Sequence, residues 1–259
     1  MERIDLHTHT LASDGSDTPA AVVQQAAALG LRAVAVTDHD TFAGLPEALA
    51  AGQRCGIEVV PGVELSTVWG GEEVHLLGYF MDTGNAALRA LMTRATDERN
   101  ARNETMVQRL HDAGYPITMD DLHAAFPGQT VLGRGKAFYV PRYNIPLEDS
   151  IRALRAAGGV PVVAHIFKYR FDDAQRAAML AAAADAGALG VEVRYTTYTP
   201  EQTEIAQALA ARFGLAPSGG SDYHGLRKPD IALGSGRGGL RVPYAYLAGL
   251  KALAGHECV

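Results

Sequence analysis

Short hydrophobic runs alternate along the chain with longer amphipathic stretches. Seven runs have the length and composition of buried strands: Ile4 to Leu6, Ala33 to Val36, Val59 to Val63, His75 to Phe80, Val160 to Ala164, Val191 to Val193 and Leu215 to Ser218. Five alanine-rich stretches have the apolar spacing of helices: Pro19 to Leu29, Leu45 to Arg54, Leu147 to Ala157, Asp173 to Ala186 and Pro200 to Phe213. Alternation of strands and helices favours parallel strands joined by right-handed crossovers. The pattern therefore predicts an α/β fold, either an open doubly wound sheet or a barrel.

One segment, residues 86–143, interrupts this alternation. A long polar helix pattern over Asn85 to Ala113 leads into Gly114-Tyr115-Pro116, a second short helix pattern and the basic turn Gly133-Arg134-Gly135-Lys136. We interpret it as a helical insertion that forms a lid over the strand ends, where loops of α/β folds carry specificity. The sequence has no internal repeat and no low-complexity linker, so residues 1–259 are expected to form a single catalytic domain.

The composition mainly excludes certain classes of protein and site. Of the 259 residues, 47% are hydrophobic and 20% are charged, the balance of a soluble globular protein. A chain of this length buries roughly 70 to 75% of its unfolded surface, so we expect any metal to serve chemistry rather than stability. Cys55 and Cys258 lie far apart without CxxC spacing, which argues against a disulfide framework or a cysteine zinc site. With no 18-residue apolar run and no signal-peptide pattern, we expect no membrane contact and a cytoplasmic location.

The charge balance limits the kinds of molecule that the protein is expected to bind. The chain has 23 lysines and arginines against 29 aspartates and glutamates, a formal charge of −6. This excess of negative charge disfavours binding to duplex nucleic acid, which depends on neutralising phosphates. It leaves room for a small phosphorylated substrate, such as a nucleotide, in a local basic pocket. The oligomeric state is left open.

Six of the nine histidines lie at or next to the ends of predicted strands, most of them close to a carboxylate. His7 and His9 are two residues apart, and in an extended segment such residues point to the same side. Asp222 and His224 have the same spacing after the last run. The remaining candidates are Asp14, His39, Glu64, His75 and His165. We expect these nine side chains to converge on one rim.

Nitrogen and oxygen donors of this kind suit manganese, zinc or ferrous iron. Any one histidine could be an ordinary core or turn residue, but six together at strand ends are far less readily explained in that way. Because nine ligands exceed the need of one ion, we predict two to three divalent ions, with Glu64 as the bridging carboxylate. Asp38 and Asp40 flank His39, so one of them either orients an imidazole or caps the following helix, and Asp40 suits the cap better.

The motifs resemble a known family over essentially the whole chain. The segments His7-x-His9, Thr37-Asp38-His39, Gly62-x-Glu64, His75, Ala164-His165 and Gly220-Ser221-Asp222-x-His224 are similar to the successive motifs of the PHP (polymerase and histidinol phosphatase) family. The resemblance implies a distorted (β/α)7 barrel with a trinuclear metal centre. It assigns one ion to His7, His9, Glu64 and Asp222, a second to Glu64, His75 and His165, and a third to Asp14, His39 and His224.

Finer likeness lies in Thr37-Asp38-His39-Asp40-Thr41, in Gly62-Val63-Glu64-Leu65-Ser66 and in the run from Ser218 to Asp222. These segments resemble PHP phosphoesterases that act on nucleoside 3′,5′-bisphosphates or on short RNA. Asp14, where some relatives have histidine, fits this branch and makes the third site more tolerant of manganese. The chain departs from the branch in two places. Ile166 replaces the usual proline after His165, and only a few residues separate His123 from Leu132, so the lid is expected to be short.

Several basic residues are candidates for substrate binding: Arg134, Lys136, Lys168, Arg194 and Lys228, with Arg142 a further basic residue of the insertion. They lie in the insertion or just after predicted strand ends, where they could bind a second phosphate or the charge on the leaving group. Gly133 and Gly135 also let backbone N–H groups approach a phosphate. The alternative for each is a solvated surface side chain.

The sequence thus predicts a metal-dependent phosphoric monoester hydrolase. The favoured reaction removes the 3′-phosphate of a nucleoside 3′,5′-bisphosphate by a metal-bridging hydroxide. A 5′-to-3′ exonuclease on short 5′-phosphorylated RNA is the second hypothesis, and the acidic balance favours the first. A histidinol-phosphatase-like enzyme is disfavoured by Asp14 and the Gly-Ser-Asp-Tyr-His ending. A noncatalytic metal-binding module is disfavoured because none of the nine ligands is missing.

Overall fold

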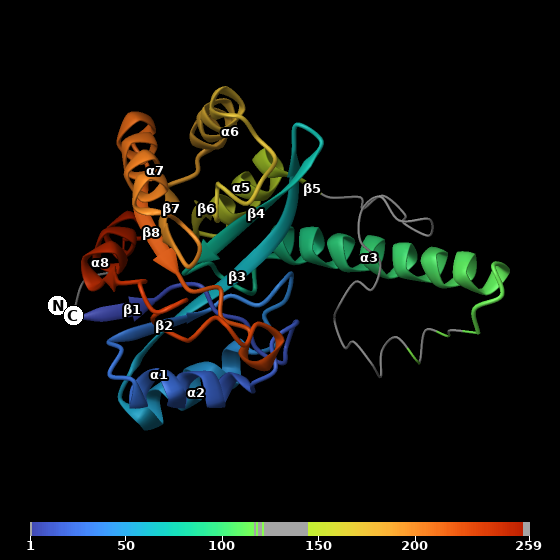
Figure 1. The fold of residues 1–259 in the computed structure, drawn as a ribbon, viewed down its shortest axis with the longest axis horizontal. Coiled ribbons are helices and arrows are strands. Elements are labelled where there is room, and N and C mark those ends of the chain that lie inside the picture. The colour runs from blue at the N-terminus through green and yellow to red at the C-terminus, as the bar shows by residue number, and fades with distance from the viewer. Residues whose placement is uncertain (1, 117, 119–120, 122–144, 256–259) are drawn as a thin grey trace.

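The strands form one sheet that curls into a nearly closed barrel with helices on its outer surface (Figure 1). The computed structural model describes residues 2–116, 118, 121 and 145–255. The strands are β1 (Arg3–Asp5), β2 (Ala33–Val36), β3 (Glu58–Trp69), β4 (Glu72–Tyr79), β5 (Ile145–Pro146), β6 (Val160–Val163), β7 (Gly190–Tyr195), β8 (Ala216–Gly220) and β9 (Val242–Pro243). The α-helices are α1 (Pro19–Ala28), α2 (Leu45–Cys55), α3 (Ala86–Asp112), α5 (Leu147–Ala156), α6 (Asp173–Ala186), α7 (Pro200–Phe213) and α8 (Tyr244–Leu253).

The predicted α/β barrel is confirmed, but its strands are not all parallel. The order in the sheet is β8-β7-β6-β4-β3-β2-β1-β9, with β5 paired to β3. Within it, β4 runs antiparallel to both β3 and β6. The expectation of parallel strands with crossovers is therefore wrong at β4. The reason is local: Gly70 and Gly71 both have positive φ, 57° and 79°, which gives a tight hairpin in place of a crossover helix.

The hairpin also lengthens β3 beyond the short run that the sequence predicts. Hydrophobic pattern ends the strand near Val63, whereas β3 continues to Trp69. Glu64 therefore lies inside a strand, whereas the sequence pattern had placed it at a strand end. His75 lies within β4 opposite Ser66. The candidate ligands Glu64 and His75 thus lie on the same face of one hairpin, with Glu64 Oε1 2.9 Å from His75 Nδ1.

The barrel closes where β1 meets the end of β8. Leu6 N donates to the Gly219 carbonyl at 3.2 Å, and Asp222 N donates to the His7 carbonyl at 2.9 Å. A Cβ atom at Gly220 would overlap His7 Cβ, so this seam requires glycine. Beneath it, buried Asp5 accepts hydrogen bonds from Ser221 N at 2.8 Å and Ser221 Oγ at 2.5 Å. Strand β1 and the end of β8 are thereby joined next to the candidate ligands.

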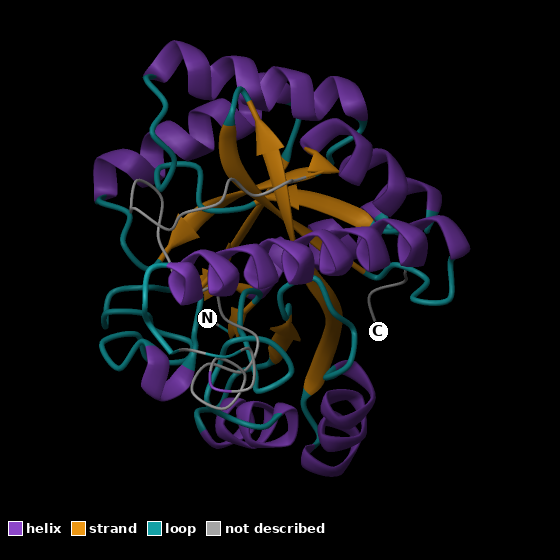
Figure 2. Ribbon diagram, turned by 90° about the vertical axis from the view of Figure 1, so that its right-hand side faces the viewer, coloured by secondary structure: helices purple, strands orange, loops and turns teal. Residues whose placement is uncertain are grey.

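Helices enclose the strands on the outside of the barrel (Figure 2). Their ends follow the sequence signals: α6 begins with a capping box formed by Asp172 and Gln175, and α7 with one formed by Thr199 and Gln202. The helix predicted over Asn85 to Ala113 is confirmed as α3, part of which extends away from the barrel in Figure 1. The short β5 and β9 and helix α8 were not predicted. No helix in the described ranges has the length and apolarity to cross a membrane.

Candidate metal centre

The nine predicted ligands lie together at one rim of the barrel. Their donor atoms form four overlapping groups, and within each group these atoms all lie within 4.8 Å of one another. The groups are His9, Asp14, His39 and His224; His7, Glu64 and His165; His7, His9 and Asp222; and His39, Glu64 and His75. Every predicted ligand belongs to at least one group. Sharing of members between groups is the geometry expected of neighbouring ions with common ligands.

Glu64 lies at the centre of these groups. Its Oε2 atom is 3.2 Å from His7 Nε2 and 3.2 Å from His9 Nε2. Its Oε1 atom is 2.9 Å from His75 Nδ1 and 3.0 Å from His165 Nε2. The two carboxylate oxygens therefore face different imidazoles. A carboxylate that bridges two ions must direct its two oxygens to different ions, and this arrangement allows it.

The residues fit divalent ions in their hydrogen bonding as well as in their chemistry. Among the described residues, His7 Nε2, both ring nitrogens of His9 and His39 Nδ1 are buried and have no hydrogen-bond partner. A buried ring nitrogen without a partner is costly unless another group satisfies it. Imidazole and carboxylate donors without thiolates suit manganese, zinc or iron. The buried clusters therefore fit a multinuclear metal centre.

Strained backbone places two of the ligands. Asp222 has a φ of 59° and His165 a φ of 27°, in the left-handed region that side-chain-bearing residues rarely adopt. Such strain costs about 1 to 3 kcal/mol and persists where the surrounding contacts impose it. At Asp222 those contacts include the seam bond from its own backbone N–H to His7. The fold thus expends stability to turn these side chains toward the cluster.

Asp38 and Asp40 both bind loop residues beside the centre. Asp38 accepts hydrogen bonds from Thr10 N at 2.7 Å and Ser13 Oγ at 2.7 Å, so it fixes the loop that carries Asp14. Asp40 accepts from Ser66 N at 2.9 Å, while α2 begins after Gly44 without a side-chain cap. Both aspartates therefore organise loops around the centre, and the prediction that Asp40 caps the following helix is wrong, because the N-cap of α2 is Gly44.

The carboxylate that orients an imidazole is Glu192, which the sequence reasoning missed. It is fully buried on β7, with Oε1 3.1 Å from His7 Nδ1 and Oε2 accepting from His165 N at 2.7 Å. This arrangement assigns the proton to His7 Nδ1 and leaves Nε2 free to bind an ion. The sequence signal for this role was the position of Glu192 between Val191 and Val193, in a run predicted to be a buried strand.

The carboxylates of the centre control its protonation. Burial disfavours the charge on His9, but the nearby Asp222 and Glu64 outweigh it and raise the pKa of His9 to about 9. Burial is likewise outweighed at His75, where Glu64 and Glu73 raise the pKa to about 9. At Glu64, burial is outweighed by its histidine neighbours, which hold the pKa of the carboxyl well below its ordinary value. Without metal, protons on imidazoles thus balance the ionised carboxylates.

We expect metal loading to displace these protons. His9 and His75, with pKa values near 9, are protonated at pH 7 and must each lose a proton to bind an ion. Manganese affinity should therefore rise with pH until about pH 9, and uptake at pH 7 should release about one proton from each. Calorimetric titrations in two buffers with different ionisation enthalpies measure this release. Equal binding enthalpies in the two buffers would contradict it.

Cationic side chains line the accessible side of the centre. Lys228 Nζ is 2.8 Å from Asp222 Oδ2 and Lys168 Nζ is 3.4 Å from the same atom, and both lysines are partly exposed. At another part of the cluster, Arg99 of α3 reaches Asp40 Oδ2 at 3.5 Å beside His39, in a cavity of about 170 Å³. The sequence reasoning did not single out Arg99, because its neighbours look like an ordinary polar helix.

The other basic candidates are placed differently. Arg194 donates to the Arg241 carbonyl at 3.1 Å and approaches the Tyr246 hydroxyl at 3.4 Å, so its contacts lie beside β7 and not among the ligands. Arg134, Lys136 and Arg142 lie outside the described residues. Their role in binding substrate stays a prediction.

A family model supports what the geometry indicates. The PHP domain model matches residues 5–194, which carry seven of the nine predicted ligands. The chain belongs to the PHP family. A protein of Haemophilus influenzae named 5′-3′ exoribonuclease is 30% identical over 247 residues, covering 86% of this chain and 90% of that protein. A 3′,5′-nucleoside bisphosphate phosphatase of Chromobacterium violaceum is 32% identical over 252 residues, covering 86% and 88%.

Solved structures agree with the PHP assignment. A protein of Bifidobacterium adolescentis superposes with a TM-score of 0.84 at 30% sequence identity, covering 97% of this chain and 96% of its own. The chain is therefore a metal-dependent PHP phosphoesterase with a distorted barrel.

Proposed function

We propose that this PHP enzyme removes the 3′-phosphate from a nucleoside 3′,5′-bisphosphate. The observation that carries the proposal is the buried cluster around Glu64 with cationic groups at two separate places beside it. Lys168 and Lys228 lie at the Asp222 side, and Arg99 lies at the His39 side. A substrate with two phosphates can use both places. The name of the Chromobacterium violaceum relative, a 3′,5′-nucleoside bisphosphate phosphatase, supports the same substrate class.

The nine residues would hold two to three ions, with manganese, zinc and iron as candidates. Bound ions would lower the pKa of coordinated water and polarise the phosphoryl oxygens, which a reaction as slow as phosphomonoester hydrolysis requires. Glu192 holds His7 in the correct tautomer for this centre. Lys168 and Lys228 would neutralise charge that develops on the phosphoryl and leaving oxygens. Tyr195 donates to Asp222 Oδ2 at 2.6 Å and so holds that carboxylate in place.

The cavity beside Arg99 suits the phosphate that does not react. Its lining residues are Ala12, Ser13, His39, Asp40, Thr41, Thr96 and Arg99. Hydroxyls and a guanidinium are the donors that phosphate oxygens accept from, and a guanidinium can donate to two of them at once. Arg134 and Lys136 are proposed as further ligands of the same phosphate. The cavity adjoins His39, so a phosphate in it would lie next to the reacting one.

We expect Arg99→Ala to raise KM for a nucleoside 3′,5′-bisphosphate by roughly tenfold or more, the scale of one lost hydrogen bond to a charged group. Hydrolysis of p-nitrophenyl phosphate should change little, because that substrate has no second phosphate. Arg89→Ala is the matched control, since Arg89 lies on the same helix and donates to the Thr83 carbonyl. Equal losses on both substrates would assign Arg99 to the fold of the insertion instead.

A phosphate-release and product screen of the manganese-loaded protein tests the proposed function itself. The panel contains nucleoside 3′,5′-bisphosphates, 5′-phosphorylated oligonucleotides and histidinol phosphate, each with product analysis. We expect the highest kcat/KM with a bisphosphate. The highest value with histidinol phosphate would refute the proposal. Exonuclease activity on short RNA is the second candidate, supported by the Haemophilus influenzae relative.

A further inference from the structure

The hydrogen-bond ladder between β4 and β6 changes at its end beside the ligand cluster. The register pairs Leu76 with Val163, so His75 and Ala164 are the next residues opposite each other. In an antiparallel ladder every second pair exchanges two N–H···O bonds. His75 and Ala164 are such a pair, because Ala164 N donates to the His75 carbonyl at 3.1 Å. The second bond of a regular ladder would run from His75 N to the Ala164 carbonyl.

The hydroxyl of Tyr169 takes the place of that second bond. It accepts from His75 N at 2.8 Å and donates to the Ala164 carbonyl at 2.9 Å. A tyrosine hydroxyl has one proton to donate, so this one is committed to the two strands. An extra oxygen atom therefore lies between the donor and the acceptor, and it holds them farther apart than a direct bond would.

The chain after β6 brings Tyr169 to this position by turning back. His165 has a φ of 27°, and Lys168 N donates to the His165 carbonyl at 2.9 Å, which closes a turn. The Tyr169 ring lies 5.9 Å from the Phe171 ring, centroid to centroid, and the Phe171 ring lies 5.4 Å from that of Trp69 at the end of β3. The tyrosine ring is therefore anchored through β3, a strand outside the ladder that its hydroxyl bridges.

Both of the bridged strand ends carry candidate ligands. His75 lies on β4, and His165 follows Ala164 directly. His75 Nδ1 and His165 Nε2 approach the same oxygen, Glu64 Oε1, at 2.9 and 3.0 Å. Their imidazole rings are 5.0 Å apart, centroid to centroid. Because both histidines are attached at the bridged backbone groups, the Tyr169 hydroxyl helps to set the distance between the two imidazoles.

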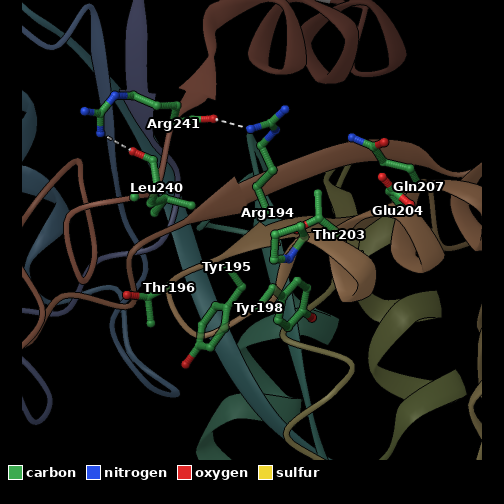
Figure 3. A pocket seen from close by; sticks show the side chains of 11 residues that line it. Arg194, Tyr195, Thr196, Tyr198, Thr203, Glu204, Gln207, Leu240 and Arg241 are labelled. Atoms are coloured by element: carbon green, nitrogen blue, oxygen red, sulfur yellow. Dashed lines mark hydrogen bonds between the residues drawn. The ribbon is translucent and has the colours of Figure 1, made fainter.

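A second tyrosine serves a different part of the cluster. The His165 ring lies 5.5 Å from the Tyr169 ring and 5.3 Å from the Tyr195 ring, centroid to centroid. The Tyr195 hydroxyl donates to Asp222 Oδ2 at 2.6 Å, and Figure 3 shows this hydroxyl directed away from Arg194. Asp222 shares no ligand group with His165. The hydroxyls of the two tyrosines therefore act on different ligands.

We propose that Tyr169 is a positioning residue for the ion that Glu64, His75 and His165 would share. Its hydroxyl fixes the two strand ends at the separation that directs both imidazoles to one carboxylate oxygen. In Tyr169→Phe, the His75 N–H and the Ala164 carbonyl either lose their partner or close into a direct bond. Either result moves His75 relative to His165. The inference concerns the metal centre and goes beyond the proposed function, because it holds for any phosphoester substrate.

Stepwise manganese titration in competition with a chromophoric chelator tests this inference. We expect Tyr169→Phe to weaken one binding step by about tenfold, the lower end of the range for partners that orient metal ligands. The other steps should keep their wild-type affinities. Tyr244→Phe is the matched control, because its hydroxyl donates to Glu58 Oε2 at 2.9 Å, away from the ligands. That variant also removes one hydrogen-bonded hydroxyl and should leave every step unchanged.

Two further backgrounds show which ion is affected. His75→Ala removes a ligand of the same ion, so adding Tyr169→Phe to it should cause no further loss. In Asp14→Asn, which belongs to a different ligand group, the weakening by Tyr169→Phe should persist. Phe171→Leu keeps the hydroxyl but loosens its ring, and it should weaken the same step by a smaller factor.

Three results would overturn the inference. They are an equal weakening of all steps in Tyr169→Phe, a further loss when it is added to His75→Ala, and wild-type affinities in both Tyr169→Phe and Phe171→Leu. The first of these would assign Tyr169 to general stability of the barrel. The titrations need no substrate, so failure of the bisphosphate reaction would overturn the proposed function and leave this inference intact.

Discussion

Glu64→Gln is expected to abolish most metal binding and to lower phosphoesterase activity by more than roughly 100-fold. That factor is the upper range for losing a carboxylate behind a metal ligand, and Glu64 itself contacts the cluster. Its two oxygens lie within about 3.3 Å of five imidazoles, those of His7, His9, His39, His75 and His165. A neutral amide of the same shape offers one oxygen and one N–H group, so it cannot bridge two ions.

Asp14→Asn is the comparison variant, because Asp14 belongs to one ligand group and Glu64 to two. We expect two to three ions per wild-type chain, the loss of more than one in Glu64→Gln, and the loss of at most one in Asp14→Asn. Elemental analysis of manganese-loaded protein purified without chelator measures the stoichiometry. Equal losses in the two variants would show that Glu64 does not bridge. A wild-type content near zero would refute the metal centre itself.

Glu192→Gln is expected to weaken metal binding by roughly 10- to 100-fold without removing any ligand. The glutamine oxygen can still accept from His165 N, as Glu192 Oε2 does at 2.7 Å. Its NH₂ group then faces His7 Nδ1, the atom that Glu192 Oε1 approaches to 3.1 Å. A donor at this place forces His7 to hold its proton on Nε2, the nitrogen that faces Glu64. The substitution thus prevents His7 Nε2 from binding an ion without moving the imidazole ring.

Metal titration monitored by competition with a chromophoric chelator measures the change. Glu58→Gln serves as the control, since Glu58 is also a strand carboxylate but pairs with Tyr244 and Lys251 away from the ligands. It should leave metal affinity unchanged. If Glu192→Gln binds manganese as tightly as the wild-type protein, then Glu192 does not determine the tautomer of His7.

The grouping of the nine candidate ligands could be predicted because its signals are local. His7 and His9 are separated by two residues in an extended segment, and Asp222 and His224 repeat that spacing. The antiparallel position of β4 could not be read in the same way, because the turn at Gly70 and Gly71 looks like many other glycine-containing loops. Strand direction depends on which partners a strand finds in the sheet, and hydrophobic pattern carries no information on that choice.

The residues that support the ligands were harder to recognise. Glu192 lies in a predicted strand. Its contact with His7, which is 185 residues away in the sequence, is visible only in the folded barrel. Arg194 and Tyr195 are adjacent, yet Arg194 contacts the Arg241 carbonyl while Tyr195 contacts Asp222. Neighbouring side chains of a strand point to opposite faces, so proximity in sequence to a ligand does not imply proximity to the centre.

The seam between β1 and β8 has a consequence for biosynthesis. His7 and His9 leave the ribosome early, but their partners Asp222 and His224 follow more than 200 residues later, and Asp5 meets Ser221 at a separation of 216 positions. Contacts so distant along the chain form late and slowly during folding. A nascent chain therefore holds several exposed histidines without the complete centre. The complete ligand cluster therefore forms only once residues 221–224 have been synthesised and have met β1.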